Sequence, residues 1–229
     1  HNVKETEFVQ EQSDCHGMAD AIVAFCNLTD SKAQRELDQH QAYKNLRGIR
    51  QIVGRDSAED AKNGTNALLK NQAFKDGLKT LIKRKLSFDL QLTPPILLAA
   101  SKVFKSIEDL PVAICHVGSP QDFSAEGMRD WEAGLKDFAE HGNVICKISG
   151  LGMFDHNWSI DSLRERVLRA IDVFSPSRIA FGSNFPVDKL YASYMKTFEA
   201  FMRLTQDFSK SEQDDMFFNV AKNFYRIKL

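Results

Sequence analysis

The sequence contains no pair of cysteines with the two-residue spacing of a zinc or redox site. Its four cysteines, Cys15, Cys26, Cys115 and Cys146, lie far apart, and three of them stand in apolar strand-like or helical contexts. This pattern is typical of reduced, buried thiols in a cytosolic protein. It argues against both a zinc centre and a disulfide framework.

The chain also lacks long hydrophobic runs and an excess of either charge. No run approaches the roughly 18 apolar residues of a membrane span, and no cationic, apolar signal segment opens the chain. The 30 basic and 31 acidic residues leave a net charge of −1, so no global field favours nucleic acid or an anionic membrane. We therefore expect a cytoplasmic protein that acts on a small-molecule substrate, with neither nucleic acid nor membrane as a partner.

Two common site motifs are missing as well. The run Gly182-Ser183-Asn184 follows neither the dinucleotide-binding nor the P-loop glycine spacing, and no GxSxG nucleophile elbow occurs. These absences disfavour a nucleotide-binding loop and a serine hydrolase.

Six short apolar segments alternate with helix-like segments along the 229 residues. Such alternation implies a parallel sheet, and 43% hydrophobic content is enough for one sizeable core. We therefore predict a single α/β domain over residues 1–229. The predicted strands cover residues 21–26, 46–53, 86–92, 112–117, 143–149 and 178–183. The predicted helices cover residues 3–15, 30–44, 74–83, 93–107, 124–141, 160–174, 189–205 and 211–225, with a loop over 54–71.

Four of the predicted strands offer polar side chains at the same end. The strand that ends near Asn184 meets Pro186, which cannot continue a paired strand, so the chain turns onto a surface there. The carboxyl ends of parallel strands carry the chemistry of α/β folds, so these side chains are expected to converge; the alternative is that each is satisfied by backbone. Side chains two apart share a strand face. By this rule each of four pairs shares a face of its own strand. The pairs are Asp89 with Gln91, Lys147 with Ser149, Gly182 with Asn184, and His116 with Ile114.

Three charged or ionisable residues are candidates for this site. His116 could act as acid, base or ligand because its ordinary pKa lies near neutrality, or it could be a histidine satisfied inside the fold. An unpaired buried ammonium is costly, so Lys147 either pairs with Asp89 or faces an anionic or carbonyl oxygen of the substrate. Arg50 could hold a substrate carboxylate or a sugar hydroxyl.

The loop after the Lys147 strand carries Asp155, His156 and Trp158. Its position after a strand places it at the active end of the predicted fold. An aromatic ring beside polar groups suits a sugar-like ligand, although a loop tryptophan also often serves only for packing.

Several segments together resemble the amidohydrolase-related family. These are TIM-barrel hydrolases that include sugar lactonases, such as L-fuconolactonase, and 2-pyrone-4,6-dicarboxylate lactonase. The resemblance implies a (β/α)8 TIM barrel in which the six strands correspond to the third to eighth, so that the first one or two βα units have no counterpart here. The segments that carry the resemblance are Leu46-Arg-Gly-Ile-Arg50, Phe88-Asp-Leu90, His116-Val-Gly-Ser-Pro120, Lys147-Ile-Ser-Gly150 and Phe181-Gly-Ser-Asn-Phe-Pro186.

The sequence departs from the family pattern in two ways. It contains no HxH, so two usual metal-binding histidines are lacking, and we predict no tightly bound metal; an HxH strand in a longer protein would restore a divalent ion such as zinc. Asn184 stands where many relatives have Asp, and an amide cannot accept a proton near neutral pH. Either Asp188 or Asp155 replaces that carboxylate, or water is activated differently, or the site is impaired.

The resemblance implies hydrolysis of a sugar or dicarboxylic-acid lactone by activated water. The alternatives are a catalytically impaired barrel that binds a small molecule, and a decarboxylase. An open sheet edge would invite association, so a homo-oligomer also stays open. The expected catalytic residues are His116, Lys147, Asn184 and Asp188, and the expected substrate-binding residues are Arg50, Asp89, Gln91, Asp155, His156 and Trp158.

Overall fold

A computed structural model describes residues 2–54 and 67–228. Six parallel strands form one sheet in chain order, as the alternating pattern predicts. The strands are β1 (Ile22–Phe25), β2 (Leu46–Ile52), β3 (Ser87–Gln91), β4 (Val112–Ile114), β5 (Val144–Ile148) and β6 (Ile179–Phe181).

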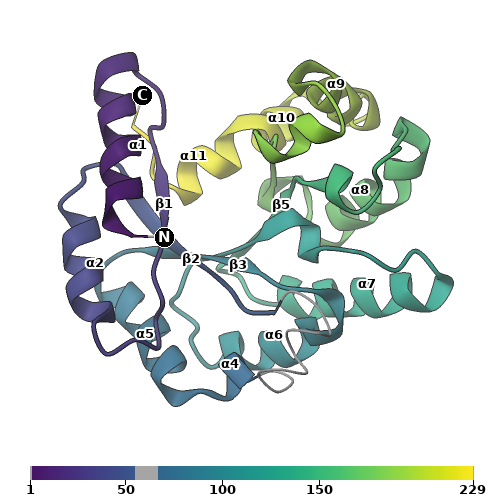
Figure 1. The fold of residues 1–229 in the computed structure, drawn as a ribbon. Helices are drawn as coiled ribbons and strands as arrows, with labels where there is room; N and C mark the ends of the chain where they lie inside the picture. The colour runs from purple at the N-terminus through teal and green to yellow at the C-terminus, as the bar shows by residue number, and fades with distance from the viewer. Residues whose placement is uncertain (1, 55–66, 229) are drawn as a thin grey trace.

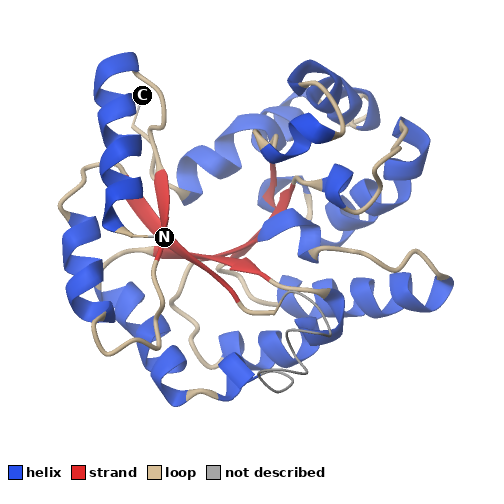
Figure 2. Ribbon diagram, in the orientation of Figure 1, coloured by secondary structure: helices blue, strands red, loops and turns tan. Residues whose placement is uncertain are grey.

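Helices follow most of these strands (Figures 1 and 2). Their positions confirm the long predicted helices within a few residues. They are α1 (Val3–His16), α2 (Ala33–Gln41), α4 (Ala67–Lys70), α5 (Gln72–Lys83), α6 (Leu97–Lys105), α7 (Ala125–Ala139), α8 (Ile160–Phe174), α9 (Tyr194–Leu204), α10 (Lys210–Asp214) and α11 (Val220–Phe224). A π-helical turn, Asp215–Asn219, joins the last two. The predicted loop over 54–71 lies mostly outside the described residues.

Two predicted boundaries are wrong. The strand predicted over 112–117 ends at Ile114, because the next residues enter a left-handed turn that cannot pair in a sheet. The helix predicted over 189–205 is divided into a short 3-10 turn, Val187–Leu190, and α9, since Ser193 caps α9 by accepting a hydrogen bond from the Lys196 N–H.

The core lies mainly between the sheet and the helices that follow its strands. Fully buried Phe88 of β3 contacts Phe74 of α5 and Phe104 of α6, with ring centroids 5.9 Å and 5.8 Å apart. In Figure 1, α5, α6 and α7 lie on one side of the sheet and α11 lies on the other. Burial of these rings contributes roughly 1.5–3 kcal/mol each.

The opposite face of the sheet carries smaller side chains and packs against the C-terminal helix. Ala113, Ile145 and Ala180, on three successive strands, form a second buried cluster with Val220 of α11. This is the face that carries the polar residues of the candidate site, so α11 and the site share one side of the sheet.

The sheet is not closed: in the described part of the chain β1 and β6 are its two edges. No helix among the described residues is long and apolar enough to cross a membrane.

Candidate active site

Asp89 on β3 is the centre of a buried polar cluster. The Lys147 ammonium, from β5, donates to Asp89 Oδ2 at 2.7 Å, and the Tyr225 hydroxyl lies 3.0 Å and 2.9 Å from the two carboxylate oxygens. Asp89 is only 1% exposed. Of the two roles that the sequence left open for Lys147, the structure therefore shows the ion pair with Asp89.

The pKa values in this cluster reflect mutual stabilisation. Burial is the largest single influence on the pKa of Lys147 and would lower it. The charge of Asp89, the interactions with Cys115 and Tyr225 and the hydrogen bond to Asp89 together outweigh burial, so the pKa is raised well above its usual value. Burial followed by the Asp89 charge raises the pKa of Tyr225. The lysine is therefore held charged and the tyrosine protonated at neutral pH.

Tyr225 is a site residue that sequence reasoning missed. It stands just after α11, 136 positions from Asp89, and nothing in its local sequence distinguishes it from a core tyrosine. Only the packing of α11 against the inner face of the sheet brings it to the carboxylate.

A second group of contacts surrounds His116. Arg50 of β2 donates to Gln91 of β3 and lies 3.2 Å from His116 Nε2. Because a guanidinium can only donate, Nε2 must accept, and the ring proton is then on Nδ1, which donates to Ser149 Oγ at 3.0 Å. The imidazole is thus held as a neutral ring in a defined tautomer.

Burial, followed by the nearby charges of Arg50 and Lys147, depresses the pKa of His116 to about 3. A base with so low a pKa takes up a proton poorly at neutral pH. His116 therefore fits a hydrogen-bonding role better than that of a general base.

The backbone around His116 explains how its side chain reaches this group. His116, Val117 and Ser119 have φ values of +54°, +50° and +55°, and Gly118 has +72°. Such left-handed angles are strained for a β-branched residue such as Val117. Trp131 of α7 supports the turn by donating to the Val117 carbonyl at 2.7 Å. His116 thus lies beyond the strand, and predicting its direction from strand alternation with Ile114 was wrong.

Asn184 and Asp188 approach the same region from the loop after β6. Asn184 donates to Asp188 Oδ1 at 3.0 Å, and Asp188 is 4% exposed. Burial raises the pKa of Asp188, and the hydrogen bond from Asn184 offsets part of that rise. The amide thus orients a carboxylate that is more basic than an ordinary one.

Gly150 shows that these two groups of side chains are adjacent. A Cβ added to Gly150 would lie 2.6 Å from His116 Nδ1 and 3.1 Å from Asn184 Nδ2, and its φ is +66°. Both side chains therefore flank one backbone turn, which any residue larger than glycine would obstruct.

The loop residues predicted to bind substrate have structural partners. Asp155 Oδ2 accepts from Ser162 at 2.7 Å and from Arg166 at 3.0 Å, which ties the loop to α8. His156 stacks on Tyr191 with centroids 4.7 Å apart, and Trp158 is buried under the Lys196 ammonium. Their predicted role in substrate binding has no support in these contacts.

The structure thus brings together seven of the predicted residues and three further ones. The group comprises Arg50, Asp89, Gln91, His116, Lys147, Asn184 and Asp188 from the prediction, with Ser149, Gly150 and Tyr225.

These residues do not form a metal site suited to zinc. Over residues 2–54 and 67–228, no group of three His, Cys, Asp or Glu side chains could hold an ion. His116 Nε2 faces the Arg50 guanidinium, and a metal ion there would be repelled by that charge.

Comparison with known proteins agrees with this architecture. A family profile described as amidohydrolase matches residues 8–227. The chain is 36% identical over 225 residues to the uncharacterized protein y4mH of Sinorhizobium fredii, covering 97% of this chain and 75% of that protein. It is 26% identical over 189 residues to an L-fucono-1,5-lactonase of Burkholderia ambifaria, covering 82% of this chain and 62% of the lactonase, less than two thirds of its length.

Among solved structures, a zinc-bound amidohydrolase from Burkholderia multivorans matches with a TM-score of 0.86 at 22% identity, over 98% of this chain and 80% of that one. This likeness confirms the predicted α/β fold of the TIM-barrel type. The family profile and the 36% identical relative together confirm the predicted resemblance. The chain therefore belongs to the amidohydrolase family.

Proposed function

We propose that this chain hydrolyses a lactone of a sugar acid or a dicarboxylic acid with an activated water. The observation that carries the proposal is the buried Asp188 carboxylate, oriented by Asn184, whose amide is adjacent, across Gly150, to the cation-rich group around His116. The similarity to an L-fucono-1,5-lactonase supports the ester class.

In this mechanism Asp188 is the general base. A water proton passes to its carboxylate while the water oxygen bonds to the lactone carbonyl carbon. The oxyanion that develops is stabilised by the positive charges of Arg50 and Lys147 on the same side of the sheet. The ring C–O bond then breaks, and the Asp188 carboxyl returns the proton to the leaving alkoxide, so that the product is an open hydroxy acid.

The polar cluster around Asp89 has a supporting role. The Lys147 ammonium is held 2.7 Å from a carboxylate oxygen of Asp89. It also lies over the ring of Tyr225, 5.4 Å from the ring centroid. A fixed cation costs little reorganisation when charge develops on the substrate. His116, neutral and fixed by Ser149, orients Arg50.

A panel of sugar 1,5-lactones, including L-fucono-1,5-lactone, together with 2-pyrone-4,6-dicarboxylate tests the proposal through acid release. We expect Asp188→Asn to lower kcat/KM on the best substrate by about 100-fold or more, the usual contribution of a general base. The matched control is Asp161→Asn, which removes a carboxylate that is 93% exposed and should leave the rate unchanged. Assays with and without a chelator, beside elemental analysis of the purified protein, test the predicted absence of a tightly bound metal.

The pH dependence gives a second measure. Since burial raises the pKa of Asp188, the acid limb of kcat/KM should lie above the ordinary carboxyl value of about 4. Removing the Asn184 hydrogen bond in Asn184→Ala should move that limb to higher pH. Full activity in Asp188→Asn, or an unmoved limb in Asn184→Ala, contradicts the assigned base.

A second candidate is a barrel that binds a small molecule without turning it over. It is favoured by the way Asp89, Lys147, Tyr225 and His116 satisfy one another. Lactones that raise the melting temperature without acid release would support it. Decarboxylation is not favoured, because a relative that matches 82% of this chain in sequence is an L-fucono-1,5-lactonase.

A further inference from the structure

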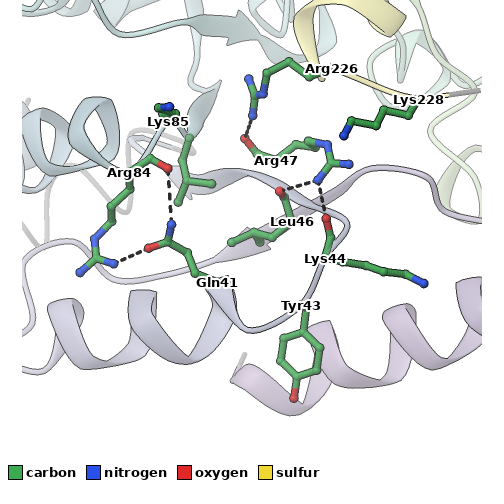
Figure 3. A pocket seen from close by; sticks show the side chains of 10 residues that line it. Gln41, Tyr43, Lys44, Leu46, Arg47, Arg84, Lys85, Arg226 and Lys228 are labelled. Carbon is green, nitrogen blue, oxygen red and sulfur yellow. Dashed lines mark hydrogen bonds between the residues drawn. The ribbon is translucent and has the colours of Figure 1, made fainter.

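A cavity of about 370 Å³ lies at the amino ends of β2 and β3, the end opposite to the candidate active site (Figure 3). Leu46, which begins β2, and Leu86, which directly precedes β3, line the cavity, whereas Arg50 and Gln91 stand near the carboxyl ends of these strands. We call this cavity the basic pocket. Its lining residues are Gln41, Tyr43, Lys44, Leu46, Arg47, Arg84, Lys85, Leu86, Arg226 and Lys228.

Six of the ten lining residues are Lys or Arg, and none is acidic. Lys44 and Arg84 pair with carboxylates outside the lining, Asp14 and Asp38, each at 2.7 Å. The other four cations have no carboxylate partner among residues 2–54 and 67–228. They are Arg47, Lys85, Arg226 and Lys228.

The negative carboxyl ends of nearby helices neutralise only part of the positive charge of the basic pocket. α2, α5 and the helix that ends with α11 all finish beside the basic pocket, and each carboxyl end carries about half a negative charge. Together they supply about one and a half negative charges, against four cations that have no carboxylate partner in the described part of the chain. A net positive charge of about two or more remains for a ligand.

The arginines are placed to donate hydrogen bonds to a ligand. Arg226 Nη2 donates to the Arg47 backbone carbonyl at 2.9 Å, which holds the Arg226 side chain beside the start of β2 (Figure 3). Within the described residues Arg47 donates only through Nη1, to the carbonyls of Lys44 and Leu46. Its Nε and Nη2 groups are therefore available, and planar guanidinium donors match the oxygens of a phosphate.

At two of these positions the backbone conformation favours glycine rather than a charged side chain. Lys85 and Arg226 have φ values of +57° and +53°, just after the ends of α5 and α11. Glycine takes such positions without strain and is the usual residue there. The side chains at both positions instead add positive charge to the pocket.

We propose that the basic pocket binds a small anion that carries a phosphate group. A phosphate dianion neutralises more of the charge than a single carboxylate would and accepts several of the available N–H donors. The volume of the cavity, about 370 Å³, and the net charge of −1 for the whole chain favour a small ligand over nucleic acid. This site is separate from the proposed hydrolytic one.

Isothermal titration with inorganic phosphate and with pyrophosphate tests the proposal. Sodium chloride keeps the ionic strength constant within each titration, and titrations are compared between salt concentrations. We expect saturable binding that weakens as salt increases and that falls by about tenfold or more in the double variant Arg47→Gln/Arg226→Gln. The matched control is Lys102→Gln/Arg203→Gln, which removes the same net charge from exposed helix positions and should bind as the unaltered protein does.

Arg47 and Arg226 also hold backbone carbonyls, so a second variant, Lys85→Gln/Lys228→Gln, removes charge without removing any hydrogen bond shown above. It should weaken phosphate binding by several-fold. Asp188→Asn should bind phosphate unchanged, which separates this proposal from the proposed hydrolysis.

Citrate is the comparison ligand because it carries carboxylates in place of phosphate. No saturable binding of phosphate or pyrophosphate overturns the proposal, as does an equal loss in the exposed control. Citrate binding as tightly as pyrophosphate would overturn the assignment to phosphate.

Discussion

Asp89 joins Lys147, Tyr225 and Cys115 in one buried polar cluster on the inner face of the sheet. It accepts hydrogen bonds from Lys147 and from Tyr225, and the Cys115 thiol lies 3.7 Å from its Oδ2. A carboxylate with so little exposure is tolerated only because these donors replace water. The ion pair therefore matters to stability as well as to the proposed reaction.

Replacing Asp89 by Asn should expose that dependence. The amide keeps the shape but leaves the Lys147 ammonium, whose side chain is 25% exposed, without its counter-charge. We expect the free energy of unfolding in urea to fall by about 3 kcal/mol, as for other broken buried pairs. The control is Asp214→Asn, which breaks a pair whose side chains are 81% and 50% exposed and should cost no more than about 1 kcal/mol. Similar losses in both variants would show that the buried pair contributes nothing special.

At this scale the sequence predicted the participants better than their geometry. Of the two roles left open for Lys147, the structure has the pair with Asp89, and both residues lie inside regular strands, where alternation holds. Alternation failed for His116, whose direction depends on a left-handed turn that Trp131 supports from another helix. Tyr225 could not be found at all, since its contact with Asp89 arises only from tertiary packing.

Single elements show the same contrast between local and long-range causes. The helices over 125–139 and 160–174 were predicted almost to the residue because their apolar spacing and Ser caps are local signals. The apolar residues of α1 do not mark the face of the helix that is buried. Phe8 is 59% exposed, whereas the polar residues Thr6 and Gln10 are buried. They bind His40 and Asn45 across the interface with α2 and the following turn.

Gly77 in α5 provides a test at the scale of an element. An alanine would favour the helix by about 1 kcal/mol, but its Cβ would lie 2.7 Å from Leu28 Cβ and 3.0 Å from the Leu28 carbonyl oxygen. Leu28 is held in place because its N–H donates to Gln51 at 3.0 Å. We therefore expect Gly77→Ala to lower the free energy of unfolding by about 1–2 kcal/mol.

The control for this substitution is Gly142→Ala. A Cβ at Gly142 meets nothing within 4 Å, so urea unfolding should show a change of less than about 1 kcal/mol. A stabilised Gly77→Ala variant would mean that the α5 contact with Leu28 relaxes more easily than its geometry indicates.

For the whole molecule, one hydrophobic cluster extends from Ile22 of β1 to Ile179 of β6 and on to Met216 near the C-terminus. The sequence predicted one domain from its uniform composition and regular alternation. It could not predict how α11 would lie across the inner face, because the small side chains Ala113 and Ala180 acquire that partner only in the folded sheet. A continuous core of this kind favours cooperative unfolding.

The two ends of the sheet should accordingly unfold together. Cys26, just after β1, is fully buried, and burial followed by the charge of Glu36 raises the pKa of its thiol to about 12, so it should resist alkylation in the folded protein. Trp131 and Trp158 report on the other half of the chain through fluorescence. In a Cys15→Ala background, which removes the exposed cysteine, pulse alkylation of Cys26 and tryptophan fluorescence should give the same urea midpoint. Alkylation of Cys26 at a clearly lower urea concentration would instead show that an amino-terminal unit unfolds before a more stable remainder. Only independent cores can lose their packing separately, so this result would contradict a single continuous core.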